Sequence, residues 1–164
     1  VELAVWFGVL ARPGIRRAAT VITHGSSAEL VAAADSADAE PGPLGAYLYE
    51  PDGAVIRARL IGDLARSVGA TMVSDAIAWF SSDTAVDTPF AARFRVIESL
   101  PYDVRALKKL VAARGIGNLE IKKRGVDVDP AELRRKLSPK GDAAATLILT
   151  RVAGRHTAIL AERD

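Results

Sequence analysis

Hydrophobic and polar side chains alternate with a period of two in two N-terminal segments, as they do along β-strands. The first segment covers residues 1–8, where Leu3, Val5 and Phe7 alternate with their neighbours, and the second covers residues 17–23. A Pro-Gly turn separates them, because proline fixes φ and glycine accepts a positive φ. We therefore predict an antiparallel pair of strands at the N-terminus.

In the middle of the chain the period changes from that of a strand to that of a helix. Residues 26–34 fit a short helix or an edge strand about equally well, and residues 35–45 have the Ala, Asp, Pro and Gly content of a loop. A strand at residues 46–49 precedes apolar residues at helical spacing, which predict one helix from about residue 51 to 68 with Asp52 as its N-cap. Short strands are predicted to follow at residues 71–73, 77–80 and 93–99.

The last third of the chain has a compact pattern of alternating helices and strands. Asp103 and Asp129 are suited to cap helices, and Gly115 is suited to end one. The predicted elements are a helix at 104–114, a strand at 118–123, a helix at 130–137, and a hairpin of strands at 144–152 and 157–162.

The charge distribution divides the chain at about residue 100. The chain has 164 residues and a net charge of only +2. Residues 1–100 hold 8 arginines, no lysine and 12 acids, a net charge of −4, whereas residues 101–164 hold 14 basic and 8 acidic residues, a net charge of +6. This break predicts a module boundary near Leu100-Pro101 and a basic second module.

Composition also narrows the classes of site. Without cysteine there is no disulfide, no thiolate zinc site and no cysteine nucleophile. The two histidines, His24 and His156, have no sequence partner for a proton relay or a helical metal site, so we interpret both as surface residues. No apolar run is long enough to span a membrane, and no leader is visible, so a bacterial cytoplasm is expected. Because the chain begins with valine, we expect it to belong to a longer polypeptide.

Three consecutive cations, Lys122, Lys123 and Arg124, end the strand predicted at residues 118–123. Gly125 breaks the strand directly after them. Adjacent positive charges repel one another, so we expect acidic groups to compensate them, either within the protein or on a partner.

These residues and their neighbours resemble the THUMP-like domain that ends a group of bacterial class I S-adenosylmethionine-dependent methyltransferases. The segment between the two parts of those proteins is similar to residues 47–57 here. The motifs that carry the resemblance are Tyr47-Leu48-Tyr49-Glu50-Pro51-Asp52-Gly53, Pro101-Tyr102-Asp103, Gly115-Ile116-Gly117, Leu119-Glu120-Ile121-Lys122-Lys123-Arg124-Gly125 and Val126-Asp127-Val128-Asp129-Pro130.

The resemblance implies an α+β chain in two parts. Residues 1–100 would be the tail strands of a methyltransferase sheet plus a connecting subdomain, and residues 101–164 would be a small α/β THUMP-like module. S-adenosylmethionine would bind the upstream methyltransferase domain, outside this chain, so this chain is not expected to be active alone. RNA, including tRNA, would be the partner, since domains called THUMP proper accompany tRNA-modifying enzymes. The alternative is a non-catalytic interaction module that packs on its own catalytic domain or on a partner subunit.

Basic residues around the cationic strand are the best functional candidates. Helices on either side of that strand could present their cations together with it as a phosphate-binding surface, although acids nearby could pair with some of them. Tyr102 is the only aromatic residue of the second module, which disfavours base stacking. The candidate RNA-binding residues are Lys122, Lys123, Arg124, Lys108, Lys109, Arg114, Arg134 and Arg135, with Lys136 beside them.

Two further motifs are weaker candidates. Tyr47, Tyr49, Glu50 and Asp52 could line a substrate pocket, but we favour structural roles, with Asp52 as a cap and the tyrosines as strand residues. The Gly-Ile-Gly sequence at residues 115–117 follows a helix and opens a strand, the reverse of a nucleotide-binding loop, so we interpret it as a helix stop.

Overall fold

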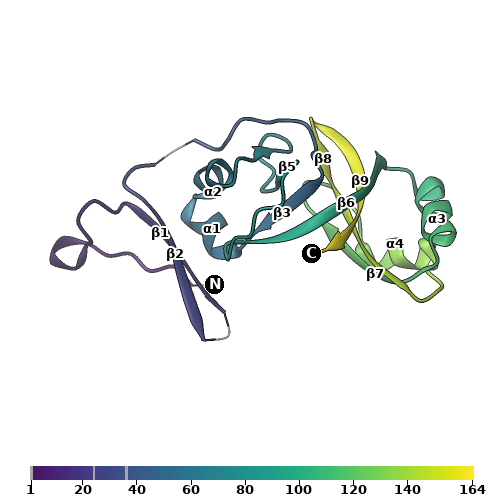
Figure 1. Cartoon of the computed structure of the whole chain (residues 1–164), viewed down its shortest axis with the longest axis horizontal. Helices are drawn as coiled ribbons and strands as arrows, with labels where there is room; N and C mark the ends of the chain where they lie inside the picture. The colour runs from purple at the N-terminus through teal and green to yellow at the C-terminus, as the bar shows by residue number, and fades with distance from the viewer. Residues whose placement is uncertain (1, 24, 36) are drawn as a thin grey trace.

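The computed structural model describes residues 2–23, 25–35 and 37–164 (Figure 1). Its strands form a two-stranded hairpin and one seven-stranded sheet with the order β4-β5-β3-β6-β9-β8-β7. The hairpin strands are β1 (Arg17–Thr23) and β2 (Ser26–Ala32). The sheet strands are β3 (Tyr47–Pro51), β4 (Thr71–Met72), β5 (Phe80–Ser82), β6 (Ala91–Pro101), β7 (Ile116–Lys123), β8 (Ala143–Val152) and β9 (Arg155–Arg163).

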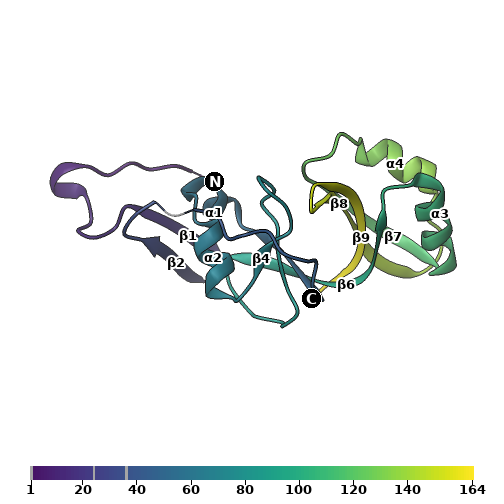
Figure 2. The same cartoon turned by 90° about the horizontal axis from the view of Figure 1, so that it is seen from above.

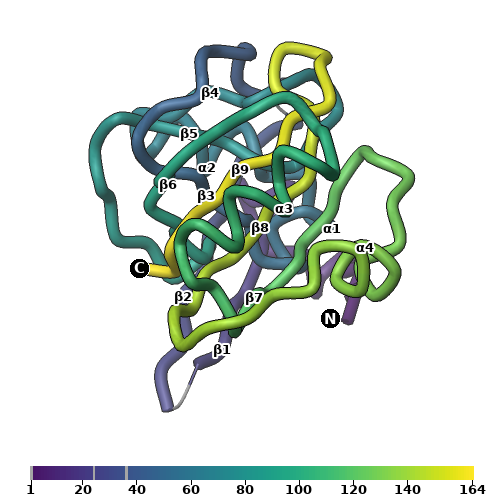
Figure 3. The backbone as a smooth tube through the Cα atoms, turned by 90° about the vertical axis from the view of Figure 1, so that its right-hand side faces the viewer, coloured from purple at the N-terminus to yellow at the C-terminus, as the bar shows by residue number. Residues whose placement is uncertain are grey.

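Within the described ranges, four α-helices accompany the strands. They are α1 (Gly53–Ala58), α2 (Ile61–Ser67), α3 (Val104–Ala113) and α4 (Pro130–Leu137), and a short 3-10 turn, η1, covers Gly8–Leu10. α1 and α2 lie near the hairpin, whereas α3 and α4 lie side by side at the opposite end of the molecule (Figures 1 and 3). This confirms the predicted mixture of helices and strands, and the structure adds that the core is mostly β.

Strand β6 joins the two ends of the molecule. It pairs antiparallel with β3 along one edge and with β9 along the other. Because β6 runs through residue 100, the residues on the two sides of the predicted module boundary share a single sheet. The division into residues 1–100 and 101–164 stays a prediction.

Three apolar clusters pack on this sheet. α1 and α2 cover one cluster, in which Tyr49 stacks on Phe80 with ring centroids 5.1 Å apart. α3 and α4 cover a second cluster over β7, β8 and β9. The third cluster contains Leu48, Phe94 and Trp79. Since neighbouring residues of a strand point to opposite faces, Leu48 and Tyr49 place the first and third clusters on opposite faces of the sheet.

The strand predicted at residues 1–8 is wrong for its described part. Residues 2–7 have no regular secondary structure, and η1 begins at Gly8. β1 pairs with β2 instead, which also shows that residues 26–34 contain a strand and not a helix. Residues 2–7 have the alternation of a strand, but no described strand pairs with them, and an isolated strand leaves its backbone groups unpaired.

The single helix predicted from residue 51 to 68 is also wrong, because the chain turns sharply at Arg59. Arg59 has a φ of 58°, in the left-handed region, and the amide of Leu60 bonds to the carbonyl of Val55 to end α1. This is a Schellman-type ending, in which a glycine usually occupies the left-handed position. Asp52 does cap α1 as predicted, accepting a hydrogen bond of 2.7 Å from the amide of Ala54.

The strand predicted at residues 77–80 lies slightly later, as β5, because residues 73–79 form a loop whose Trp79 fills the third cluster. β6 is longer than predicted. The predicted elements of the last third are confirmed with boundaries that differ by one or two residues.

The turn at Arg59 predicts opposite effects for the same substitution at two nearby exposed positions. Arg59→Gly should raise the free energy of unfolding by up to about 1 kcal/mol, since glycine accepts the left-handed conformation without a Cβ clash. Arg57→Gly, within α1, should lower it by about 0.5–1 kcal/mol. Urea unfolding of the two variants measures both values. Equal destabilisation by both substitutions would contradict the break at Arg59.

Candidate nucleic-acid interface

Local capping signals determine where α3 ends and α4 begins, and β7 lies between them in the chain. The carboxylate of Asp103 accepts a 2.7 Å hydrogen bond from the amide of Ala106, and that of Asp129 accepts one of 2.7 Å from the amide of Glu132. Gly115 follows α3 with a φ of 60°, which lets the chain reverse into β7. The interpretation of residues 115–117 as a helix stop is therefore confirmed.

Lys122 points away from the helices and into the protein. Its Nζ lies 2.8 Å from Glu50 Oε2 and 3.5 Å from Glu120 Oε1, and 5.7 Å from the centre of the Phe94 ring. The Lys122 side chain is only 20% exposed and that of Glu50 is 24% exposed. Within the protein, Glu50 thus supplies the compensating acid that the row of three cations led us to expect.

Three other candidates also have partners within the protein. Arg114 lies 2.7 Å from Glu98, and the guanidinium of Arg134 donates to the backbone carbonyl of Leu119 on β7. Lys136 pairs with Glu132 at 2.8 Å on the same helix. This hydrogen bond raises the pKa of Lys136 and lowers that of Glu132.

The remaining candidates have no ion pair among the described residues. Four of them are exposed, and Arg124 is half-buried at the end of β7. The pKa of Asp129 is lowered, first by the hydrogen bond from the Glu132 amide and further by the charges of Lys123 and Arg135. We call this set the cation surface; it consists of Lys108, Lys109, Lys123, Arg124 and Arg135.

The residues of the predicted tyrosine pocket have structural partners. Tyr49 is fully buried; its hydroxyl donates to the carbonyl of Thr84 at 3.0 Å and accepts from the amide of Val86 at 2.9 Å. The guanidinium of Arg93 lies over the Tyr47 ring, with its central carbon 5.8 Å from the ring centre. With Glu50 paired to Lys122 and Asp52 capping α1, each residue contributes to the fold.

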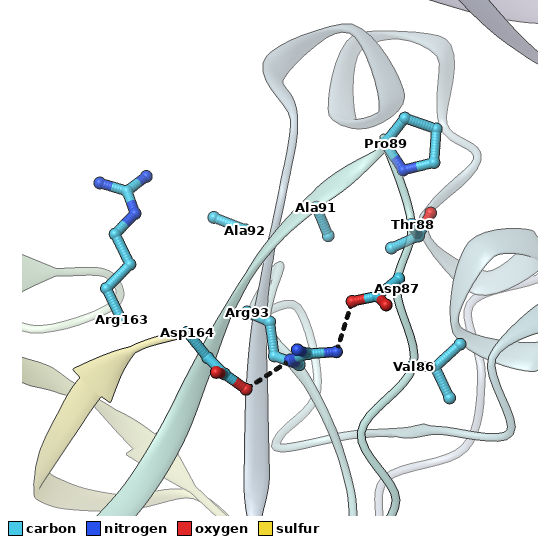
Figure 4. A pocket seen from close by; sticks show the side chains of 9 residues that line it. All are labelled: Val86, Asp87, Thr88, Pro89, Ala91, Ala92, Arg93, Arg163 and Asp164. Carbon is cyan, nitrogen blue, oxygen red and sulfur yellow. Dashed lines mark hydrogen bonds and ion pairs between the residues drawn. The ribbon is translucent and has the colours of Figure 1, made fainter.

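A hollow that the sequence did not indicate lies beside the end of β9 (Figure 4). It has a volume of about 350 Å³ and is lined by residues 86–89, 91–93, 163 and 164. Arg93 lies between two carboxylates, 2.8 Å from Asp87 and 2.9 Å from Asp164, so its charge is compensated. Asp164 is 71 residues from Arg93, and only the pairing of β6 with β9 brings them together.

A second open hollow of about 490 Å³ lies over β7 and β8 and shares Arg163 with the first. Its polar lining includes Glu120, which accepts a 3.1 Å hydrogen bond from Thr146. Neither hollow contains a histidine or a lysine.

Further chemistry is not evident in the part of the chain that the structure describes. No group of three or more metal-binding side chains comes together there, and no helix there is long and apolar enough to cross a membrane. His156 is exposed, and its carbonyl accepts a hydrogen bond from the amide of Tyr102. His24 lies outside the described residues.

A protein-family model described as THUMP domain-like matches residues 91–163. The chain contains a THUMP-like domain. It consists of β6, α3, β7, α4, β8 and β9, and it carries the whole cation surface. Glu50 lies on β3, outside this domain, so the ion pair with Lys122 connects the domain to the residues before it.

Comparison with known proteins connects this chain to S-adenosylmethionine-dependent methyltransferases. An uncharacterized S-adenosylmethionine-dependent methyltransferase of Mycobacterium tuberculosis, represented by two strains, is 34% identical over 151 residues, 92% of this chain. The chain spans only 41% of the length of these relatives. This chain and the Mycobacterium tuberculosis methyltransferase are homologous over almost all of this chain.

A solved structure has the same fold. The crystal structure of a candidate methyltransferase from Porphyromonas gingivalis matches 88% of this chain and 36% of its own, with a TM-score of 0.69 at 20% sequence identity. At this identity the likeness concerns the fold alone.

The Lys122–Glu50 ion pair predicts an energetic coupling between the THUMP-like domain and β3. In a double-mutant cycle with Lys122→Met and Glu50→Gln, urea unfolding should give a coupling free energy of about 1 kcal/mol, because each charge is mostly shielded from solvent by the other half of the molecule. Lys123→Met, one residue along and exposed, is the matched control and should change stability by less than about 0.5 kcal/mol. Additive effects of the two substitutions would contradict the coupling.

Proposed function

We propose that this chain is the C-terminal part of an S-adenosylmethionine-dependent methyltransferase that acts on RNA in the cytoplasm, and that its THUMP-like domain positions the RNA. The observation that carries the proposal is the cation surface, whose five positive side chains have no ion pair among the described residues. An acidic partner outside the chain would compensate them.

Phosphate groups are the acidic partner that this surface suits. Lys108, Lys109 and Lys123 supply point charges, whereas Arg124 and Arg135 can make two parallel hydrogen bonds to one phosphate. The net charge of +6 over residues 101–164 would attract a polyanion over a longer distance. Lys122, Arg114 and Arg134, each with a partner inside the protein, would contribute to this field without being free to bind.

Contacts to the RNA backbone, rather than to bases, fit this surface. From residue 101 onward the only aromatic residue is Tyr102, which is half-buried against the cluster under α3 and α4. Stacking of unpaired bases needs exposed aromatic rings, whereas folded or double-stranded RNA can be recognised by its shape and phosphates. We therefore place folded RNA, such as tRNA, ahead of single strands.

We assign the cofactor to the portion of the protein that corresponds to the part of the relatives outside the match. A dinucleotide-type cofactor loop follows a strand and opens a helix, with glycines that admit the ligand. The glycines at residues 115 and 117 follow α3 and open β7, so they do not form a loop of this kind. No methyl-transfer step is therefore assigned to residues of this chain, which we do not expect to be active alone.

The alternative function, an interaction module that packs on a catalytic domain or a partner subunit, is favoured by a separate observation. The N-terminal residues expose large apolar side chains at the other end of the molecule from the cation surface. The two functions do not exclude each other, since they use different surfaces.

The cation surface predicts salt-dependent binding of tRNA by the intact chain. Removing two of its charges with Lys123→Ala and Arg135→Ala should weaken binding and lower the slope of log K against log salt concentration by about 2, because each lost phosphate contact releases about 0.9 fewer counterions. Fluorescence anisotropy across a salt series measures both quantities.

The matched control removes two arginines at the tip of the β8–β9 hairpin, Arg151→Ala and Arg155→Ala, which are exposed and lie outside the cation surface. It has the same net charge as the first double variant. Equal weakening by both variants would reduce the effect to net charge and contradict a defined surface. Absence of binding at low salt would contradict the RNA-binding function.

A further inference from the structure

β7 is the last strand of the seven-stranded sheet, so one of its two edges has no neighbouring strand among the described residues. The strand pairs only with β8, in parallel. It lies beside α3 and α4, at the end of the molecule remote from the hairpin (Figures 1 and 2). The free edge of β7 therefore belongs to the THUMP-like domain, which also carries the cation surface.

The pairing of β7 with β8 determines which of its backbone groups point to the free edge. The amide of Arg124 donates to the carbonyl of Leu149 on β8. Along a strand the backbone groups of successive residues point alternately to the two edges, and the amide and carbonyl of one residue point to the same edge. The even-numbered residues 120–124 therefore bond toward β8, and the odd-numbered residues 119–123 point outward.

One of the outward groups has a partner within the protein. The guanidinium of Arg134 on α4 donates to the carbonyl of Leu119, as expected if that carbonyl points away from β8. Farther along the strand, the carbonyl of Ile121 and the amide of Lys123 make no hydrogen bond among the described residues. This acceptor and this donor flank Lys122 on the open edge, and we call them the edge pair.

The surrounding contacts hold the edge pair in place. The Lys122 side chain lies 2.8 Å from Glu50 and is only 20% exposed, so the residue between the two groups is anchored inside the protein. The bond from the Arg124 amide to β8 fixes the backbone on the other side. Groups that are already fixed lose little conformational freedom when a ligand binds them.

An acceptor beside a donor suits a hydroxyl group, which can donate one hydrogen bond and accept another. Every nucleotide of RNA carries such a group, the 2′-hydroxyl, and A-form duplexes display it along their wide, shallow minor groove. A phosphate offers only acceptors, so the carbonyl of Ile121 would repel it. The chemistry of the edge pair therefore favours the sugar of RNA over its phosphate.

The cation surface supplies the attraction that brings RNA to this edge. The Lys123 side chain is exposed, and Lys123 contributes both a charge to that surface and an amide to the edge pair. In RNA a phosphate follows every ribose, so a sugar bound at the edge pair would bring a phosphate to Lys123.

A protein strand suits this edge less well. Arg134 covers the carbonyl of Leu119 and the strand ends at Lys123, so a partner strand would find few free groups to bond. A second copy pairing antiparallel through the same edge would bring the cations at the end of β7 against the same cations. Like charges on opposed strands are destabilising, and lysines on an edge strand prevent such pairing.

We propose that the edge pair, the carbonyl of Ile121 and the amide of Lys123, binds a 2′-hydroxyl and selects RNA over a nucleic acid that lacks this group. The proposal rests on the proposed function, since the cation surface must hold the RNA. It adds a contact to the sugar that charged side chains alone do not make.

Two duplexes of one sequence test the proposal with the intact chain, one of RNA and one of 2′-fluoro RNA. Fluorine keeps the A-form and the phosphates but cannot donate a hydrogen bond. In fluorescence anisotropy the RNA duplex should bind about fivefold more tightly, the effect expected of one hydrogen-bonded hydroxyl. The slopes of log K against log salt concentration should be equal, because the phosphate contacts are the same.

Two variants separate the amide from the charge of the same residue. Lys123→Ala removes the charge alone and should weaken binding of both duplexes while keeping the preference for RNA. Lys123→Pro also removes the amide donor, and it should lower the preference to about twofold or less. Proline is tolerated where the amide of an edge strand points outward, so both variants should fold.

Hydrogen exchange reads the site without a substitution. The RNA duplex should slow exchange of the Lys123 amide, and the 2′-fluoro duplex should slow it much less. The amide of Lys122, which points to β8, is the matched control and should be protected from the start.

Four results would overturn the proposal. Equal affinity for the two duplexes with a steep salt dependence would remove the edge pair and leave the RNA-binding surface intact. A preference kept in full by Lys123→Pro would remove it as well. Protection of the Lys123 amide that grows with the concentration of the chain alone would place a second copy at this edge. Absence of binding to either duplex at low salt would contradict the RNA-binding function, and the edge pair with it.

Discussion

The backbone pairing of β6 is the interaction on which the rest of the structure depends. This 11-residue strand bonds to β3 on one side and to β9 on the other. It therefore joins β3, β4 and β5, which pack against α1 and α2, to β7, β8 and β9, which pack against α3 and α4, in one seven-stranded sheet. The ion pairs Lys122–Glu50 and Arg93–Asp164 both span the region that this strand organises. A THUMP-like domain held in this way cannot turn freely relative to the residues before it.

The alternation of side chains along β7 decides which cations are available for binding. Lys122 and Lys123 are neighbours in sequence but point to opposite faces of the sheet. Lys122 consequently meets Glu50 and the Phe94 ring, whereas Lys123 stays exposed, and its charge lowers the pKa of Asp129. A run of positive charge in a sequence is thus divided by the fold into a structural part and a part that is free to meet phosphate.

The sequence predictions are accurate where the interactions that determine the structure are local along the chain, and less accurate where those interactions join distant residues. The last third was predictable because Asp103, Gly115 and Asp129 act within a few residues of themselves. The break at Arg59 was hidden because an arginine occupies a position where glycine is usual. The strand predicted at residues 1–8 is wrong for its described part, because alternation indicates only a tendency and a strand also needs a neighbouring strand.

The same distinction between local and long-range signals applies to the candidate site residues. The cations around β7 could be named from the sequence, but their internal partners could not, because Glu50 and Glu98 lie on other strands. The hollow beside Arg93 depends on a contact across 71 residues and has no local signal.

The central claim is that the cation surface, which consists of Lys108, Lys109, Lys123, Arg124 and Arg135, binds RNA. Titrating the ¹⁵N-labelled chain with a short RNA duplex tests it most directly, by mapping which backbone amides shift in NMR spectra. Shifts should concentrate at residues 108, 109, 123, 124 and 135, diminish as salt is added, and spare the hairpin tip near Gly154. Shifts spread evenly over all exposed cations, or centred on Arg151 and Arg155, would contradict it.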